Sequence, residues 1–467
     1  MTAPSPEVVI LTEAGAGIGF GHLGRCAAIY DALDDAGAAP RLVVQGLPAL
    51  PDALIEGRRA MCDDWLEHPK TAVAGATIAV VDSYEAPMRV YDAVQSAVRT
   101  ALWVDDEVRL DYPVGIVLNS GMTAETMPYA RRPGSLYLLG PSYHPLRSAF
   151  RYLPRHDTGR LERVLVVFGG SDIRGLGPPA AASLAAAGVP QVDLVCGDRT
   201  AAEMAEAMMH ADLAVGSTGQ TLYELAAAGL PTVGVVVVDN QRKNAEGWAR
   251  TGFLALAGDW DAPCIAERVV AEVARLSDRD ARAEAAAAGR AMVDGFGASR
   301  IAARCLASAK VAAMNLASAT AADSDAVLDL ANDPVVRGAS FSSEPISRED
   351  HERWFAARLA DPNTMLLLAR DDQGVVGQVR FDIAGLWATV GIALADRVRL
   401  NGLGLPLLES GLLQLYEQHP EILAVVAFVR PSNPASLTVF ATAGFAEVGR
   451  TQVAGHDAVR LERAFIR

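Results

Sequence analysis

The sequence predicts an α/β protein with two Rossmann-like units followed by a smaller α+β domain. Short, continuous apolar runs alternate with helical patterns through the first 275 or so residues, as buried parallel strands and their crossover helices do. The alternation restarts at 163–168, which indicates a second unit. After an alanine-rich stretch at 280–322, the later strands gather around one glycine loop, which is typical of an α+β domain.

The chain length agrees with this division. At roughly 150 residues per domain, 467 residues predict about three domains. We place them at 1–150, 151–312 and 313–467, with the last boundary in the alanine-rich junction. Because each part has its own pattern, the sequence predicts that a cut near residue 312 yields two separately active pieces.

Composition excludes several classes of protein. Apolar residues make up 51% and charged residues 21%, which is globular composition. With 41 basic and 56 acidic residues, the net charge of −15 argues against general binding to nucleic acid. Five cysteines without a CxxC pair predict neither a disulfide framework nor a zinc site, so we expect no metal. The opening MTAPSPEVVILTEAG lacks a basic segment and 229–238 is too short to span a bilayer; we expect a cytoplasmic protein without a membrane span.

The first unit opens with a strand, a glycine-rich loop and a helix. The strand is 8–12, the loop is 15–22 and the helix is 24–36. Further strands are expected at 41–44, 78–81, 101–104 and 115–118, and the unit closes near 137–141.

The second unit repeats this plan. Its expected strands are 163–168, 191–196, 213–215 and 232–238, and a helix at 221–228 is ended by Gly229 and Pro231. Ligands of such sheets bind beyond the carboxyl ends of the strands, so we expect a cleft between the two units.

The third unit begins with helices and continues with strands. Helices are expected at 325–330 and 348–359, and strands at 364–369, 375–383 and 390–394. The glycine loop 399–404 then opens a helix to 417, and a strand at 424–429 and a helix at 434–443 follow.

The loop at 15–22 is the first candidate site. Glycines let backbone amides approach a phosphate, and the following helix adds its positive N-terminal end. His22 stands at the junction of loop and helix, where an imidazole can serve as a base near neutral pH. The alternative is a histidine that caps the helix or belongs to the core.

Residues 19–26, GFGHLGRC, resemble the GxGHxxRC signature of the UDP-sugar hydrolases of pseudaminic acid biosynthesis. Further blocks of that family follow in the same order at 82–84, 140–141, 168–172, 221–225 and 239–241, and the resemblance covers about 7–305. It implies a two-lobed, glycosyltransferase-B-like fold in which water replaces a sugar acceptor.

The resemblance also implies roles for particular residues. His22 would be the general base, and the loops around Gly19 and Gly219 would hold the diphosphate. The expected substrate-binding residues are Gly19, Gly21, Arg25, Tyr84, Gly170, Ser171, Gly219, Gln220, Thr221, Glu224, Asn240 and Gln241. Gln220 departs from the Gly-Ser that the family more often has.

Several of these residues have a plain structural alternative. Glu224 would bind ribose or only complement a helix N-terminus. Asn240 and Gln241 would hold the sugar or only form a turn, and Tyr84 would line the sugar pocket or only pack a loop. The pair Asp105 and Asp106 has no companion histidine, so we expect a solvated turn rather than a metal site.

The loop Arg399-Leu-Asn-Gly402-Leu-Gly404 resembles the R/Q-x-x-G-x-G/A loop of GNAT acetyltransferases, and the likeness covers about 314–465. It implies acetyl-CoA as co-substrate. The expected cofactor-binding residues are Ile392, Leu394, Arg399, Gly402, Gly404, Asn433 and Ser436. Blocks within 332–355 resemble the subgroup that acetylates amino groups of nucleotide-activated sugars.

The proton donor of this domain is open. Phe440 stands where the GNAT family often has a tyrosine acid, so the thiolate leaves unaided or another group protonates it. Glu344, Gln378 and His351 are candidates for the acceptor side, each with an equally good surface interpretation, and Trp354 is expected in the core.

Together the resemblances imply a bifunctional enzyme whose partners are a UDP-linked amino sugar and acetyl-CoA. The third domain would acetylate a 4-amine, and the first two would hydrolyse the product. Two alternatives remain: a UDP-sugar glycosyltransferase with a fused acetyltransferase, and a non-catalytic nucleotide-sugar sensor with a protein-acetylating tail.

Overall fold

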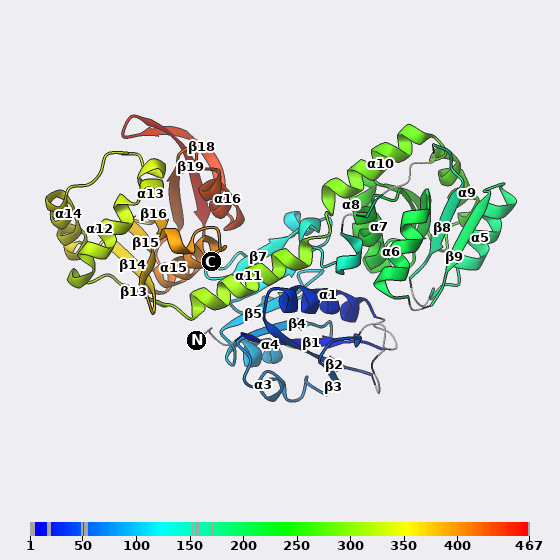
Figure 1. The fold of residues 1–467 in the computed structure, drawn as a ribbon, viewed down its shortest axis with the longest axis horizontal. Helices are drawn as coiled ribbons and strands as arrows, with labels where there is room; N and C mark the ends of the chain where they lie inside the picture. Colours follow the sequence, from blue (N-terminus) through cyan, green and yellow to red (C-terminus); the bar gives the residue numbers. More distant parts are fainter. Residues whose placement is uncertain are drawn as a thin grey trace.

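The computed structural model describes residues 5–15, 20–47, 50, 55–151, 153–154, 159–169, 172–197 and 199–465. They form three β-sheets with flanking helices, and the three bodies lie side by side in Figure 1. The fold is mixed α/β, with two parallel sheets in the N-terminal part of the chain and a mostly antiparallel sheet in the C-terminal part.

The first lobe contains a seven-stranded parallel sheet in the order β3-β2-β1-β4-β5-β6-β7. Its elements are β1 (Glu7–Glu13), α1 (Gly21–Asp35), β2 (Ala39–Gln45), β3 (Ala60–Cys62), α3 (Pro69–Ala72), β4 (Ile78–Asp82), α4 (Met88–Gln95), β5 (Thr100–Val104), β6 (Ile116–Asn119) and β7 (Leu136–Leu139). Every residue of β4 and β5 is buried, which explains their continuous apolar sequence. The strand order changes direction between β1 and β4, where such sheets bind ligands.

The second lobe has a five-stranded parallel sheet in the order β12-β11-β10-β8-β9. Its elements are β8 (Arg163–Val167), α5 (Gly177–Ala186), β9 (Gln191–Val195), α6 (Ala201–His210), β10 (Leu213–Ser217), α7 (Gln220–Ala228), β11 (Thr232–Val236), α8 (Arg242–Thr251), β12 (Leu254–Asp259), α9 (Ile265–Arg275) and α10 (Arg279–Met292). Gly229 ends α7 in the left-handed conformation that glycine adopts most readily.

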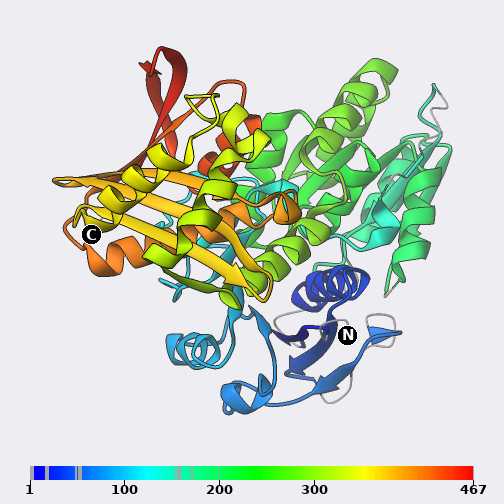
Figure 2. The same cartoon turned by 60° about the vertical axis from the view of Figure 1, so that its left-hand side comes forward.

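The third body is a seven-stranded sheet in the order β13-β14-β15-β16-β17-β19-β18, drawn in yellow to red in Figure 2. Its elements are β13 (Asn315–Ser318), α12 (Ser324–Asn332), α13 (Pro334–Ala339), α14 (Arg348–Ala360), β14 (Thr364–Asp371), β15 (Gly374–Ala384), β16 (Trp387–Leu394), α15 (Gly404–Gln418), β17 (Ala424–Val429), α16 (Pro434–Thr442), β18 (Ala446–Val453) and β19 (His456–Ala464). All pairings are antiparallel except that of β16 with β17. The sequence did not lead us to expect β3, β13, β18 or β19.

Two central strands of this third sheet separate along their length. β16 pairs with β15 from Trp387 to Leu394, but it pairs with β17 only over Trp387, Ala388 and Thr389. Beyond Thr389, the edge of β16 that faces β17 therefore has no ladder partner among the residues that the structure describes.

Helix α11 (Gly297–Ala312) connects the three bodies. It packs on α1 and β5 of the first lobe and on α15 of the third body, and Figure 1 shows it running between them. Buried residues of the first lobe, of α11 and of the third sheet belong to one continuous apolar cluster. The first lobe and the C-terminal body therefore share a core, which does not favour the expectation that a cut near 312 releases independent pieces.

A buried ion pair strengthens the same contact. Arg463 lies 2.6 Å from a carboxylate oxygen of Glu409, and both side chains are almost fully buried. The amide of Gly134 donates to Glu409 at 3.2 Å, and Arg463 donates to the carbonyl of Arg132 at 3.1 Å. Burial raises the pKa of Glu409 to about 7 against the opposing charge of Arg463.

Candidate functional site

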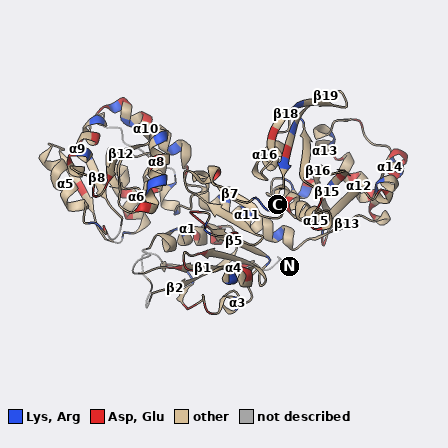
Figure 3. Cartoon of the chain, turned by 180° about the vertical axis from the view of Figure 1, so that it is seen from behind, with Lys and Arg blue, Asp and Glu red and all other residues tan. Residues whose placement is uncertain are grey.

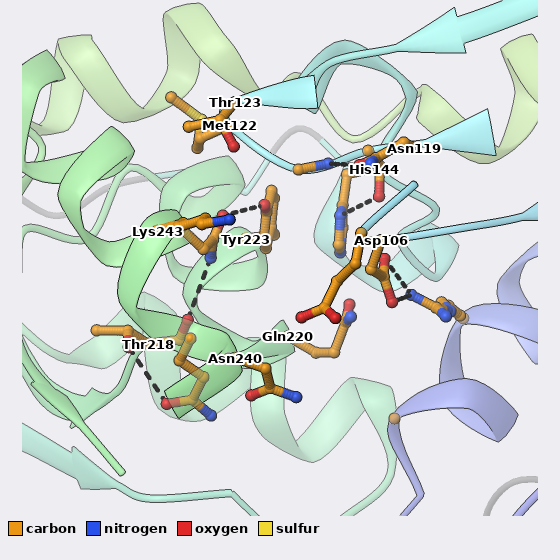
Figure 4. Close-up of a pocket in the computed structure, with 18 of the residues that line it drawn as sticks. Asp106, Asn119, Met122, Thr123, His144, Thr218, Gln220, Tyr223, Asn240 and Lys243 are labelled. Atoms are coloured by element: carbon orange, nitrogen blue, oxygen red, sulfur yellow. Dashed lines mark hydrogen bonds and ion pairs between the residues drawn. The ribbon is translucent and has the colours of Figure 1, made fainter. Parts of the chain in front are cut away.

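A cavity of about 370 Å³ lies between the first and second lobes. Residues of both lobes line it, as the labelled side chains in Figure 4 show. The lining residues are Gly21, His22, Arg25, Tyr84, Asp106, Glu107, Asn119, Ser120, Gly121, Met122, Thr123, Met127 and His144 from the first lobe, and Thr218, Gly219, Gln220, Tyr223, Val238, Asp239, Asn240, Gln241, Lys243 and Asn244 from the second.

His22 reaches this cavity from the first turn of α1, and a buried carboxylate holds it from behind. Its Nδ1 atom lies 2.7 Å from Oδ1 of Asp82, the last residue of β4. Burial alone would raise the pKa of Asp82, but the charges of Arg25 and His22 outweigh it and hold that pKa well below its ordinary value. A carboxylate at Nδ1 fixes the ring and leaves Nε2 as the nitrogen that can accept a proton.

Arg25 organises two carboxylates around that histidine. Its Nε and one terminal nitrogen each lie 2.6 Å from Asp82, and its other terminal nitrogen donates to both oxygens of Asp106 at 2.9 Å. The Tyr84 hydroxyl donates to Asp106 at 2.7 Å, and its ring meets the His22 ring edge-on at 4.4 Å. With both carboxylates paired to it, Arg25 positions its neighbours, although it also lines the cavity.

Asp105, the neighbour of Asp106, is not in a solvated turn, so that expectation is wrong. Its side chain is buried and accepts hydrogen bonds from the hydroxyls of Tyr129 at 2.5 Å and Tyr112 at 3.1 Å. These tyrosines lie farther along the chain, so the local sequence gave no sign of them.

Two helix N-termini face the cavity from opposite sides. Neither α1 nor α7 has a side-chain cap, and Gly21 and Gln220, their first residues, line the cavity. A Cβ atom on Gly21 would lie 3.5 Å from Cγ of Gln220, so the two ends lie close together. Uncapped amides and two helix dipoles of the same sign make this a favourable place for a phosphate group.

His144 and Tyr223 form the back of the cavity, and sequence reasoning missed both. Their rings stack at 3.5 Å with an interplanar angle of 5°. Nδ1 of His144 lies 2.9 Å from the Ser120 hydroxyl. Burial, followed by the nearby charge of Arg25, lowers the pKa of His144 to about 3. This imidazole is therefore neutral at physiological pH and differs in role from His22.

Polar side chains of the second lobe close the other wall. The Thr218 hydroxyl donates to Oε1 of Gln241 at 3.2 Å, and the Tyr223 hydroxyl donates to Asn244 at 2.6 Å. Asn240, in the short 3₁₀ turn Asp239–Gln241, is exposed and lines the cavity. These residues offer hydrogen bonds of both kinds to a polyhydroxylated ligand.

The structure brings most of the predicted residues of the first site together. Gly21, His22, Arg25, Tyr84, Gly219, Gln220, Asn240 and Gln241 all line the cavity. Thr221 and Glu224 do not; Arg147 donates to Glu224 at 3.1 Å. Gly19, Gly170 and Ser171 lie outside the described residues.

Four of the predicted cofactor residues lie on β16 and in the loop that opens α15. Ile392 and Leu394 are half-buried residues in the part of β16 that does not pair with β17. Gly404 is the first residue of α15, which has no side-chain cap. Gly402 has φ +72°, a left-handed conformation that favours glycine, whereas Gly404 does not.

Three other predicted cofactor residues have partners of their own. Arg399 lies 2.5 Å from Asp333 and 3.1 Å from Asp396, and donates to the carbonyl of Leu394 at 3.0 Å. The amide of Ser436 donates to Asn433 at 3.1 Å, which caps α16. Arg399 therefore stabilises the loop through its own ion pairs, and Asn433 caps the N-terminus of α16.

The candidates for the acceptor side are spread over this body. His351 is buried, stacks on Phe355 and lies 2.9 Å from the carbonyl of Ser324, so it is a core residue. Glu344 is exposed, and Gln378 has a buried oxygen without a hydrogen-bond partner among the described residues. Phe440 is buried against Phe445.

The described ranges contain no metal-binding cluster and no membrane-spanning helix. Among these residues, no group of three or more His, Cys, Asp or Glu side chains is arranged to hold a metal ion. No described helix has the length and apolar character needed to cross a bilayer. Figure 3 shows basic and acidic residues mixed on outer helices such as α10 and α14.

Comparison with known proteins places one part of the chain in a family. Residues 314–446 match the Acetyltransferase (GNAT) domain. No curated protein matches the chain. Solved structures that resemble it include spermidine N-acetyltransferase from Vibrio cholerae with CoA and spermine, at 18% identity over 32% of this chain and 95% of that one, with a TM-score of 0.29. Aminoglycoside acetyltransferase AAC(6')-Ib with ribostamycin and coenzyme A gives 18% identity over 32% of this chain and 93% of that one, with a TM-score of 0.29. On the family match, the C-terminal body of this chain is a GNAT acetyltransferase domain.

Proposed function

We propose that the chain is a bifunctional nucleotide-sugar enzyme of pseudaminic acid biosynthesis. Its GNAT domain acetylates the 4-amine of a UDP-4-amino-4,6-dideoxy-N-acetyl-altrosamine. Its two glycosyltransferase-B-like lobes hydrolyse the product, UDP-2,4-diacetamido-2,4,6-trideoxy-β-L-altropyranose, to the free sugar and UDP. The observation that carries the hydrolase half is the pair of His22 and Asp82 in a cavity that two uncapped helix N-termini also face.

In the hydrolase half, one group takes the proton and other groups stabilise the leaving charge. His22 accepts a proton from water as the water oxygen bonds to the anomeric carbon. The bond from that carbon to the diphosphate oxygen breaks, and the electron pair leaves with UDP. Attack opposite the leaving group inverts the anomeric centre. The ends of α1 and α7 stabilise the growing negative charge on the diphosphate.

The second half follows from the GNAT domain. Acetyl-CoA supplies an activated acetyl group as a thioester. The free edge of β16 near Ile392 offers backbone amides to its carbonyl, and the first turn of α15 offers amides to its pyrophosphate. The amine nitrogen bonds to the thioester carbon, the carbon–sulfur bond breaks, and the nitrogen gives up a proton to the sulfur or to solvent. Phe440 cannot donate a proton, so the sulfur leaves as thiolate or takes its proton from another group.

One incubation tests both halves. The full-length protein is mixed with the UDP-4-amino sugar and acetyl-CoA, and the products are followed by mass spectrometry. We expect the acetylated UDP-sugar first, then free sugar and UDP. Transfer of the sugar only when an acceptor alcohol is added would show that the two lobes are a glycosyltransferase and not a hydrolase. Tight binding of the UDP-sugar without turnover would identify a sensor.

A further inference from the structure

We infer that Arg304, on the helix that connects the first lobe to the GNAT domain, binds the pyrophosphate of CoA. This inference rests on the proposed use of acetyl-CoA. It means that a segment preceding the GNAT domain supplies a residue of the acetyltransferase site. Arg304 lies in α11, before the start of the GNAT match at residue 314.

The position of Arg304 is the first observation. A Cβ atom built on Gly402 would lie 3.7 Å from a terminal nitrogen of Arg304 and 3.7 Å from Cβ of Ala307. The glycine loop that opens α15 therefore lies directly against one turn of α11. Because α11 packs on α15, the turn of α11 that carries Arg304 is held beside this loop by the shared core.

The charges of the loop are the second observation. Arg399 is paired with Asp333 and Asp396, and Arg397 makes a two-pronged ion pair with Asp371 at 2.6 and 2.7 Å. The loop's own cations are thus already neutralised by carboxylates. Arg304 has neither a hydrogen bond nor an ion pair with any other described residue, and it is half-buried.

A cation would bind a diphosphate beside this loop more tightly than amides alone, and the loop's own arginines are already paired. The amides at the start of α15 provide partial positive charge, but a pyrophosphate carries full negative charges. The planar guanidinium of an arginine matches phosphate oxygens with parallel hydrogen bonds. Arg397 and Arg399 are each paired with a carboxylate, whereas no carboxylate of the described chain pairs with Arg304.

The test measures CoA affinity of the full-length protein by calorimetry. We expect Arg304→Ala to weaken CoA binding on the order of threefold to thirtyfold. Arg304→Lys should bind CoA more tightly than Arg304→Ala but less tightly than the wild type. The loss should shrink as salt is raised, because salt screens a half-exposed charge. The same loss is expected with 3′-dephospho-CoA, since the pyrophosphate is the group bound.

Controls separate this inference from the proposed function. Lys310→Ala removes an exposed cation six residues farther along α11, and it should leave the affinity unchanged. Equal losses in both variants would show a general field effect and overturn the inference. So would an unchanged affinity in a folded Arg304→Ala variant, or a loss confined to CoA with its 3′-phosphate. If the wild type does not bind CoA, the proposed acetyltransferase half fails together with this inference.

Discussion

Nδ1 of His22 lies 2.7 Å from Oδ1 of Asp82, and this carboxylate is completely buried at the end of β4. The pair joins the helix that follows β1 to the neighbouring strand β4, where the order of the first sheet changes direction. Arg25 balances the carboxylate from the other side at 2.6 Å. The arrangement keeps a charged aspartate behind the imidazole without leaving a buried charge unpaired.

The His22→Asn variant should lose UDP release and keep acetyl transfer. A general base contributes about 10²- to 10⁴-fold, and asparagine cannot accept the proton. Release of UDP from the diacetamido substrate and acetylation of the amino substrate are measured on the same preparation. His210→Asn serves as the control, because that histidine is exposed at the end of α6, outside the cavity lining. Near-normal UDP release by a folded His22→Asn variant would show that His22 is not the general base.

The neutral state of His144 predicts a pH dependence of stability. The pKa of His144 is about 3 in the folded protein against an ordinary value of 6.5. Between these values the unfolded chain binds a proton that the folded chain excludes, so the free energy of unfolding falls as pH falls from about 6.5 towards 3. At full effect the slope is about 1.4 kcal/mol per pH unit.

The measurement compares the wild type with His144→Asn by scanning calorimetry at several pH values. The variant loses the stack on Tyr223 at every pH, but it also loses the titrating group. The wild-type advantage in Tm should therefore shrink on acidification. An advantage that stays constant from pH 7 to 4 would contradict a lowered pKa at this residue.

A branched side chain at Gly404 should block the CoA loop. A Cβ there meets Val439 at 3.6 Å and Leu394 at 3.7 Å, which is ordinary contact, so Gly404→Ala fits. The extra methyl groups of Gly404→Val have no such room and crowd the first turn of α15. We expect CoA affinity to fall at least about tenfold in the valine variant only, which amounts to about 1.4 kcal/mol of binding free energy. Hydrolysis of a diacetylated UDP-sugar should not change; equal CoA affinity in both variants would show that the loop does not touch the cofactor.

Cleavage of the chain between α11 and β13 should leave the two pieces bound to each other. Residues 312 and 313 are exposed, so a protease site placed there is accessible. The apolar cluster spans the first lobe and the GNAT domain, and Glu409 and Arg463 of the GNAT domain form hydrogen bonds with the backbone of Gly134 and Arg132 in the first lobe. Separation would expose the apolar surface to water and break these bonds. Size-exclusion chromatography after cleavage should show one complex. Two soluble pieces that elute separately and stay active would show that the shared core is not needed to hold the pieces together or to keep them folded.

The local sequence determined the strand-loop-helix units and the identity of several cavity residues. Continuous apolar runs marked buried strands such as β4 and β5, because parallel strands covered on both faces carry no alternation. The two glycine loops and His22 could be predicted because a loop between a strand and a helix has a local sequence signature. The GNAT expectation, built on the loop 399–404, is confirmed by the family match over 314–446.

Only the tertiary structure decided which distant residues meet. His144 and Tyr223 stack, Asp105 is buried by tyrosines from later in the chain, and Arg304 reaches Gly402, although nothing in their local sequence signals these partners. The same holds for α11, whose alanine-rich sequence predicts a helix but not the lobe on which it packs. The physical reason is that helix and turn preferences act over a few residues, whereas packing and ion pairing depend on which surfaces the folded chain brings together.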